Sequence, residues 1–166
     1  MTGKAERSDL HGLGGWLGFL VFMLTIISPI RILLTTAAGL NVESAVKSQI
    51  GPNWQIYEIL SWVLAAATVS LTLLVAWRLV YVQRRSTVAI AIGGLWAIAM
   101  LPTLIDVAFG LVLFSEAART YLTQWLILEL LRSAISPALW SAYLLRSRRV
   151  ANTYLKDVSE TERIFG

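Results

Sequence analysis

Apolar residues fill four long stretches of this chain, and polar residues gather in the shorter segments between them. Each stretch is long enough to cross the hydrocarbon core of a bilayer, which takes about twenty residues of α-helix. The pattern therefore predicts an all-α protein, a four-helix transmembrane bundle. The predicted helices cover about residues 13–40, 56–82, 87–114 and 121–145.

Three polar segments separate the predicted helices, at residues 41–55, 83–86 and 115–120. The first is the longest, and its apolar residues recur at helical spacing from Val42 to Ile50, which favours a short helix on the membrane surface. Short connections force the helices that they join to be antiparallel neighbours. The expected architecture is therefore a bundle of two antiparallel hairpins.

The composition favours one integral membrane domain over residues 1–166. The chain is 57% hydrophobic and only 14% charged, whereas soluble domains carry about 25% charged residues. The first apolar stretch is far longer than the core of a signal peptide, so we interpret it as a retained transmembrane helix. Residues 146–166 are expected to continue the fourth helix as a helical tail.

Basic residues cluster at particular ends of the predicted helices, which predicts the orientation of the chain in the membrane. The opposite side carries only Lys47 and Arg119. Both termini are therefore expected in the cytoplasm, and the net charge of +4 points to membrane lipids and not to nucleic acid as the partner. The residues predicted to contact lipid headgroups are Arg84, Arg85, Arg146, Arg148 and Arg149.

The chain lacks the residues that most enzymes and metalloproteins need. It has no cysteine and only one histidine, His11, so disulfides, thiolate metal sites and paired haem ligands are excluded. No glycine-rich phosphate-binding motif follows a predicted strand. The sequence therefore predicts no cofactor, no metal and no catalytic residue, and a protein that is not an enzyme.

Charged residues inside the apolar stretches are the candidates for a functional site. A charge near the bilayer centre costs about 2.5–3.5 kcal/mol on insertion scales, so it needs a partner or a purpose. Two arginines and two acids fall at similar depth in the outer half of the membrane, assuming a rise of about 1.5 Å per residue. The predicted intramembrane polar network consists of Arg31, Asp106, Glu129 and Arg132.

Two interpretations of this set remain open. As a structural network, Glu129 and Arg132 pair within one helix, and Arg31 pairs with Asp106 between helices. As a functional site, the acids serve a proton relay or bind a polar substrate. Arg78, nearer the cytoplasmic side, can extend to the headgroups on its own.

The chain opens with two short motifs, Gly12-Leu13-Gly14-Gly15-Trp16-Leu17 and Ile27-Ser28-Pro29-Ile30-Arg31. Together with residues near the other end, they resemble a bacterial inner-membrane family, domain of unknown function 2569. At the other end, Tyr143 and the run from Arg146 to Tyr154 resemble the family's closing pattern, with Arg148 in place of lysine and Tyr154 in place of phenylalanine. The resemblance implies a small four-helix protein from bacteria and no established activity, so no functional residue is transferred.

These observations favour a non-enzymatic protein of the bacterial inner membrane that serves as an accessory or assembly subunit of a larger complex. Its expected partners are membrane lipids and either other membrane protein subunits or further copies of itself. The alternative is a small oligomeric transporter or proton-coupled carrier that uses Asp106 and Glu129. A third possibility is an enzyme subunit that binds lipid or quinone between its helices.

Overall fold

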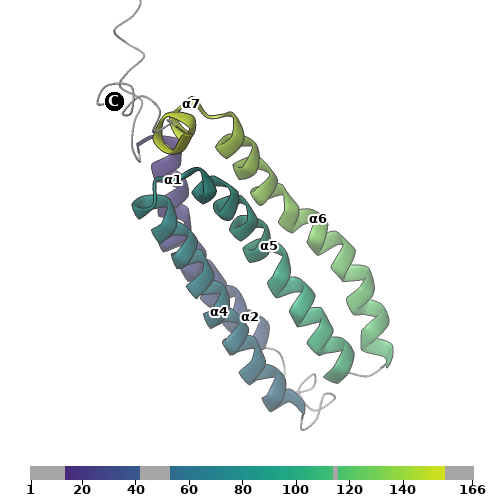
Figure 1. The fold of residues 1–166 in the computed structure, drawn as a ribbon. Helices are drawn as coiled ribbons and strands as arrows, with labels where there is room; N and C mark the ends of the chain where they lie inside the picture. Colours follow the sequence, from purple (N-terminus) through teal and green to yellow (C-terminus); the bar gives the residue numbers. More distant parts are fainter. Residues whose placement is uncertain (1–13, 42–52, 114–115, 156–166) are drawn as a thin grey trace, which may run out of the picture.

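The computed structural model describes residues 14–41, 53–113 and 116–155, and within them every regular element is a helix (Figure 1). This confirms the predicted all-α class. The first stretch holds α1 (Trp16–Phe22), the π-helical turn η1 (Met23–Ile27) and α2 (Ser28–Leu40). The elements that follow are α4 (Asn53–Tyr81), α5 (Arg85–Leu113), α6 (Glu116–Arg146), α7 (Arg148–Val150) and the π-helical turn η2 (Ala151–Leu155).

Helices occupy each of the four predicted stretches, and their ends differ from the prediction by a few residues. Within the described residues, three helices are long and apolar enough to cross a membrane, namely Trp16–Leu40, Asn53–Tyr81 and Arg85–Phe109. The fourth long helix, α6, is more polar because it carries Glu129 and Arg132. The predicted surface helix between Val42 and Ile50 lies outside the described residues, as does the chain beyond Leu155.

A proline explains the irregular turn in the first long helix. Proline has no backbone N–H, and its ring clashes with the carbonyl four residues earlier in a regular α-helix. Pro29 is the second residue of α2, and the carbonyl four residues before it belongs to η1, where the backbone widens to π-helical geometry at Met23–Ile27. A π-helical turn opens the hydrogen-bond ladder at this place without ending the helix.

The long helices pack in the order in which they occur along the chain. In Figure 1, α2 lies along α4, α4 along α5, and α5 along α6. The turn between α4 and α5 is tight, and the buried Thr87 hydroxyl donates a hydrogen bond of 2.6 Å to the carbonyl of Val82 across it. Between α5 and α6, the indole Nε1 of Trp96 donates to Ser141 Oγ at 3.2 Å.

Glycine sets the distance between α4 and α5. A Cβ atom added to Gly94 would lie 2.4 Å from Cγ2 of Val75, which is far inside van der Waals contact. Small residues at a helix interface allow this close backbone approach, which is a common packing mode in membrane proteins. Gly93, the next residue, has no atom within 4 Å of the same position and faces open space.

The sequence predicts that the tail continues the fourth helix, but the structure shows a break in the helix at Ser147. Ser147 takes an extended conformation, and its hydroxyl accepts a hydrogen bond from the backbone N–H of Val150, which caps the short α7. The chain then folds back over the bundle, where the hydroxyl of Tyr154 donates to the backbone carbonyl of Leu79. Val150 and Tyr154 are both buried.

The hydrophobic core lies at the end of the bundle where this tail docks, which we call the basic end. It joins residues of α1, η1, α4, α5, α6 and the tail, including Leu20, Leu79, Leu144 and Tyr154. Outside this cluster, the buried apolar residues among those described are Leu40, Ala65, Val107 and Pro137. We call the remainder of the helices, which carries Arg31, Asp106, Glu129 and Arg132, the distal half.

We predict that Gly94→Ala destabilises the fold, because the new methyl group must displace the stiff side chain of Val75. Overpacking of this kind costs about 1–3 kcal/mol. Thermal unfolding of the purified protein in detergent, followed by circular dichroism, measures the loss. Gly93→Ala is the matched control and should leave stability unchanged or slightly raised, since alanine favours helix by about 1 kcal/mol over glycine. Equal stability of both variants would contradict the close α4–α5 contact.

Candidate functional site

The polar contact that joins two long helices in the distal half involves Tyr57 and Asp106. The Tyr57 hydroxyl on α4 donates a hydrogen bond of 2.9 Å to Oδ1 of Asp106 on α5. Both side chains are half-buried, and the buried hydroxyl oxygen of Ser61 lies one turn further along α4. A carboxylate that accepts a hydrogen bond in an apolar setting is held more firmly than it would be in water.

The structure places the four predicted network residues differently from the sequence-based interpretation. Arg31 and Arg132 are exposed, and Asp106 and Glu129 are partly buried. In the part of the chain that the structure describes, no ion pair joins any two of these four side chains. Asp106 is bonded to Tyr57 and not to Arg31, so the expected link between the first and third helices is replaced by a link between α4 and α5.

Helix order explains why equal depth did not bring these charges together. Arg31 lies on α2, which packs on α4, whereas Glu129 and Arg132 lie on α6, which packs on α5. The α4–α5 pair therefore separates the two arginines. Within the described residues, α1 and α6 meet at the basic end, where the rings of Phe19 and Trp140 are 6.1 Å apart.

Arg132 borders a groove of about 550 Å³ between α6 and the start of α1. Aromatic rings form one part of it, since Trp16 and Trp140 pack edge to face with their centroids 6.5 Å apart. The outer face of α6 on either side of Arg132 is strongly exposed and apolar. Its members are Ile127, Leu128, Leu131, Ile135, Leu139 and Leu145.

The arginines predicted to contact headgroups gather at the basic end. Arg84, Arg85, Arg146 and Arg148 are exposed, as such a contact requires. Arg149 is half-buried and lies against the glycines that precede α1.

The contact of Arg149 explains why two glycines precede α1. A Cβ added to Gly14 would meet Nη1 of Arg149, so a larger residue here would require the end of the flexible arginine side chain to move. Gly15 has a φ of 63°, a left-handed conformation that strains any other residue. The glycine pair and the arginine thus form one contact between the two ends of the described chain.

Among the described residues, no three histidine, cysteine or acidic side chains lie close enough to hold a metal ion. Tyr57 and Ser61 are the polar residues of the distal half that sequence reasoning missed. Their signal in the sequence is the spacing of four, which puts both hydroxyls on one face of a helix.

Apolar helices long enough to cross a bilayer, packed side by side, define a multi-pass membrane protein. The chain belongs to the family of proteins of unknown function DUF2569, whose family model matches residues 10–155. This match confirms the resemblance carried by the residues at the two ends. The chain matches no curated protein and no solved structure.

The tail contact has a consequence for stability at high pH. Burial raises the pKa of the Tyr154 hydroxyl from 10.0 to about 12, and the nearby Tyr143 adds to the rise. A group whose pKa is raised by folding stabilises the fold fully below its unfolded pKa, and that contribution is lost as the pH passes the folded pKa. The docked tail should therefore weaken between pH 10 and pH 12.

We predict that Tyr154→Phe lowers the free energy of unfolding at neutral pH by about 1 kcal/mol, because the Leu79 carbonyl loses its donor. The variant should also lose less stability than the wild type between pH 10 and pH 12, since phenylalanine cannot ionise. Thermal unfolding at a series of pH values tests both effects. Tyr81→Phe is the control, because Tyr81 is 71% exposed. A wild-type pH profile matched by Tyr154→Phe would contradict the role of this hydroxyl.

Proposed function

We propose that this protein is a non-enzymatic integral protein of the bacterial inner membrane that serves as an accessory or assembly subunit of a larger membrane complex. In this proposal α6 crosses the bilayer with the three more apolar helices, as two antiparallel hairpins. Both termini lie in the cytoplasm, because the arginine-rich basic end belongs on the side where positive charge is retained. The family match is consistent with this architecture and assigns no activity.

The observation that carries the proposal is the exposure of Arg132 in the middle of α6. Its flanking residues Leu128 and Leu131 are 69% and 66% exposed, so the surroundings of the guanidinium are apolar. An arginine at this depth costs about 2.5–3.5 kcal/mol when it faces lipid. A carboxylate on another membrane protein would remove that cost and add a charge-assisted hydrogen bond.

The groove beside Arg132 is suited to a transmembrane helix of a partner. Its wall offers the aromatic surface of Trp16 and Trp140 and the small Ser136, which allow close packing and large contact area. Aromatic residues and arginine dominate the binding energy of many protein interfaces. Arg31, exposed on α2 on the other side of the α4–α5 pair, offers a second contact of the same kind.

We predict that a photo-crosslinking residue at position Leu128, one turn from Arg132, captures a second membrane protein in living cells. The adduct should disappear in the Arg132→Gln background and persist with Arg132→Lys, which keeps the charge. The same crosslinker at Val63, which is 60% exposed on α4, is the matched control. Gel mobility and mass spectrometry identify the captured chain.

The mass of the adduct distinguishes the possible partners. An adduct with a protein whose mass differs from 18.4 kDa supports an accessory subunit. An adduct of two copies supports a homo-oligomer, in which Glu129 of one copy faces Arg132 of the other. Capture of lipid alone at Leu128, or an adduct that survives Arg132→Gln, would contradict the proposal.

A proton-coupled carrier is the second candidate, and the Tyr57–Asp106 contact favours it. Asp106 is half-buried, is bonded to a neutral hydroxyl and has no ion-pair partner among the described residues. An acid in this setting can exchange a proton more readily than one held by an arginine. Tyr57 and Ser61 extend the polar path by one turn along α4.

We predict for this second function that Asp106→Asn abolishes proton flux into vesicles that contain the purified protein. The asparagine carbonyl still accepts from Tyr57, so stability should change by less than about 1 kcal/mol. A pH-sensitive dye trapped in the vesicles measures flux under an imposed potential. Glu58→Gln is the control variant, because Glu58 lies near the start of α4. Wild-type flux no greater than in empty vesicles would exclude the carrier.

A further inference from the structure

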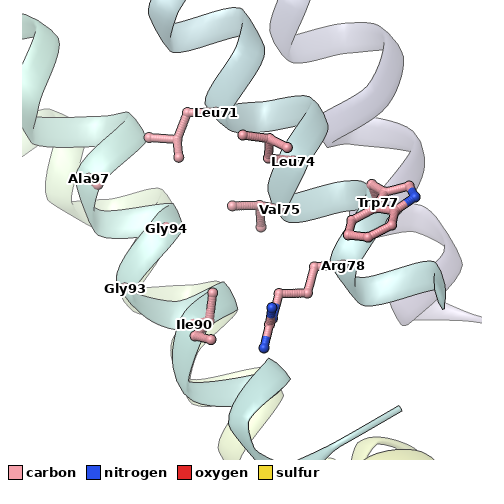
Figure 2. A pocket seen from close by; sticks show the side chains of 9 residues that line it. All are labelled: Leu71, Leu74, Val75, Trp77, Arg78, Ile90, Gly93, Gly94 and Ala97. Carbon is pink, nitrogen blue, oxygen red and sulfur yellow. The ribbon is translucent and has the colours of Figure 1, made fainter. Parts of the chain in front are cut away.

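An apolar groove of about 400 Å³ runs between α4 and α5 and ends at a charged residue (Figure 2). Leu71, Leu74 and Val75 form its wall on α4, and Gly93, Gly94 and Ala97 form its wall on α5. The volume falls within the range of about 300–1,000 Å³ that is usual for ligand sites. Arg78 lies at the end of the groove nearest the turn between the helices.

Glycine creates the space for an occupant. Gly93 has no atom within 4 Å of its missing Cβ, so the groove is open along its α5 wall. The groove also opens to the outside of the bundle, because Leu74, Trp77 and Ile90 on its rim are 60%, 54% and 45% exposed. In a membrane-spanning chain this outer surface faces lipid.

The sequence predicts that Arg78 can extend to the headgroups, and the structure shows which neighbour its side chain contacts. Its side chain crosses towards α5, where Nη2 donates a long hydrogen bond of 3.4 Å to Ser86 Oγ. Its Nε is buried and has no hydrogen-bond partner within the described ranges of the chain. A buried donor without an acceptor costs about 1–3 kcal/mol, and more for a charged group.

No acid of the two helices can neutralise Arg78. Between Glu58 and Asp106 the sequence contains no aspartate or glutamate, yet it contains Arg78, Arg84 and Arg85. The described tail beside them adds Arg148 and Arg149 and no acid. The electrostatic complement of this end of the groove is therefore an anion that comes from outside the described chain.

We propose that the groove binds one anionic glycerophospholipid, with an acyl chain along Gly93 and Gly94 and the phosphate on Arg78 and Ser86. The phosphate accepts from the Arg78 guanidinium and from the Ser86 hydroxyl. Arg78 lies in the last turn of α4, beside Trp77 and Tyr81, whose rings are 6.0 Å apart. Paired aromatic residues of this kind mark the headgroup level of a membrane, which is where the phosphate belongs.

The test uses the full-length protein in detergent and measures binding of phosphatidylglycerol by native mass spectrometry. Arg78→Gln should weaken binding at least about tenfold, since a charge-assisted hydrogen bond contributes about 1.5–3 kcal/mol. Gly93→Leu should weaken it similarly by filling the groove, without a clash at its Cβ. Arg31→Gln and Gly39→Leu are the matched controls, because Arg31 is exposed in the distal half, away from the groove, and Gly39 also faces open space.

Each outcome decides the proposal. Loss of binding in Arg78→Gln and Gly93→Leu, with both controls unchanged, supports it. Binding of phosphatidylcholine as tight as that of phosphatidylglycerol would overturn the role of charge. Displacement of the lipid by millimolar inorganic phosphate, with Gly93→Leu unaffected, would show a free phosphate site in place of a lipid groove. Wild-type affinity in both groove variants would overturn the proposal entirely.

Discussion

A charge inside a membrane-crossing helix must be neutralised or solvated, and this constraint governs the distal half of the molecule. Arg31 and Arg132 are both exposed, on helices that the α4–α5 pair holds apart. Asp106 is engaged by Tyr57 on the neighbouring helix. Among the described residues neither arginine has a counter-charge, and the partner that we propose follows from that imbalance.

Packing at the basic end makes this open arrangement stable. There the contact of Gly94 with Val75, the stacking of Trp16 and Phe19 on Trp140, and the docked tail hold α1, α4, α5 and α6 together. Lipid tails are as apolar as leucine, so membrane helices associate through close fit more than through hydrophobic burial. A tight fit at one end alone leaves the other end available for contacts with lipid or protein.

Much of the fold was predictable because hydropathy and length are properties of the residues themselves. The helices lie where the apolar stretches are, and the short turn before Arg85 forces α4 and α5 to be antiparallel neighbours. The candidate site was less predictable, because depth says nothing about which helices touch. Arg31 and Asp106 lie at similar depth on helices that are not direct neighbours. Tyr57, an ordinary aromatic residue near a helix start, was therefore overlooked as the partner of Asp106.

For Arg78 and the tail too, the residue types can be read from the sequence, but their contacts cannot. The sequence shows that Arg78 is basic and near a helix end, but only the structure shows that its side chain turns inward, towards Ser86. The arginines after α6 predict a cytoplasmic anchor, whereas the turn at Ser147 depends on one extended residue and brings Tyr154 back to Leu79. Contacts between segments that are far apart in the sequence depend on how the folded chain packs, which the sequence pattern alone does not predict.

The helices meet closely at the basic end and diverge in the distal half. Distances between pairs of spin labels measure this divergence, and the absence of cysteine allows specific labelling at introduced cysteines. One pair replaces Phe22 and Leu139 near the basic end, and the other replaces Leu33 and Leu128 in the distal half. We expect a clearly longer distance for the distal pair. Equal short distances would contradict it, because the bundle would then be closed and Arg31 would lie close to α6.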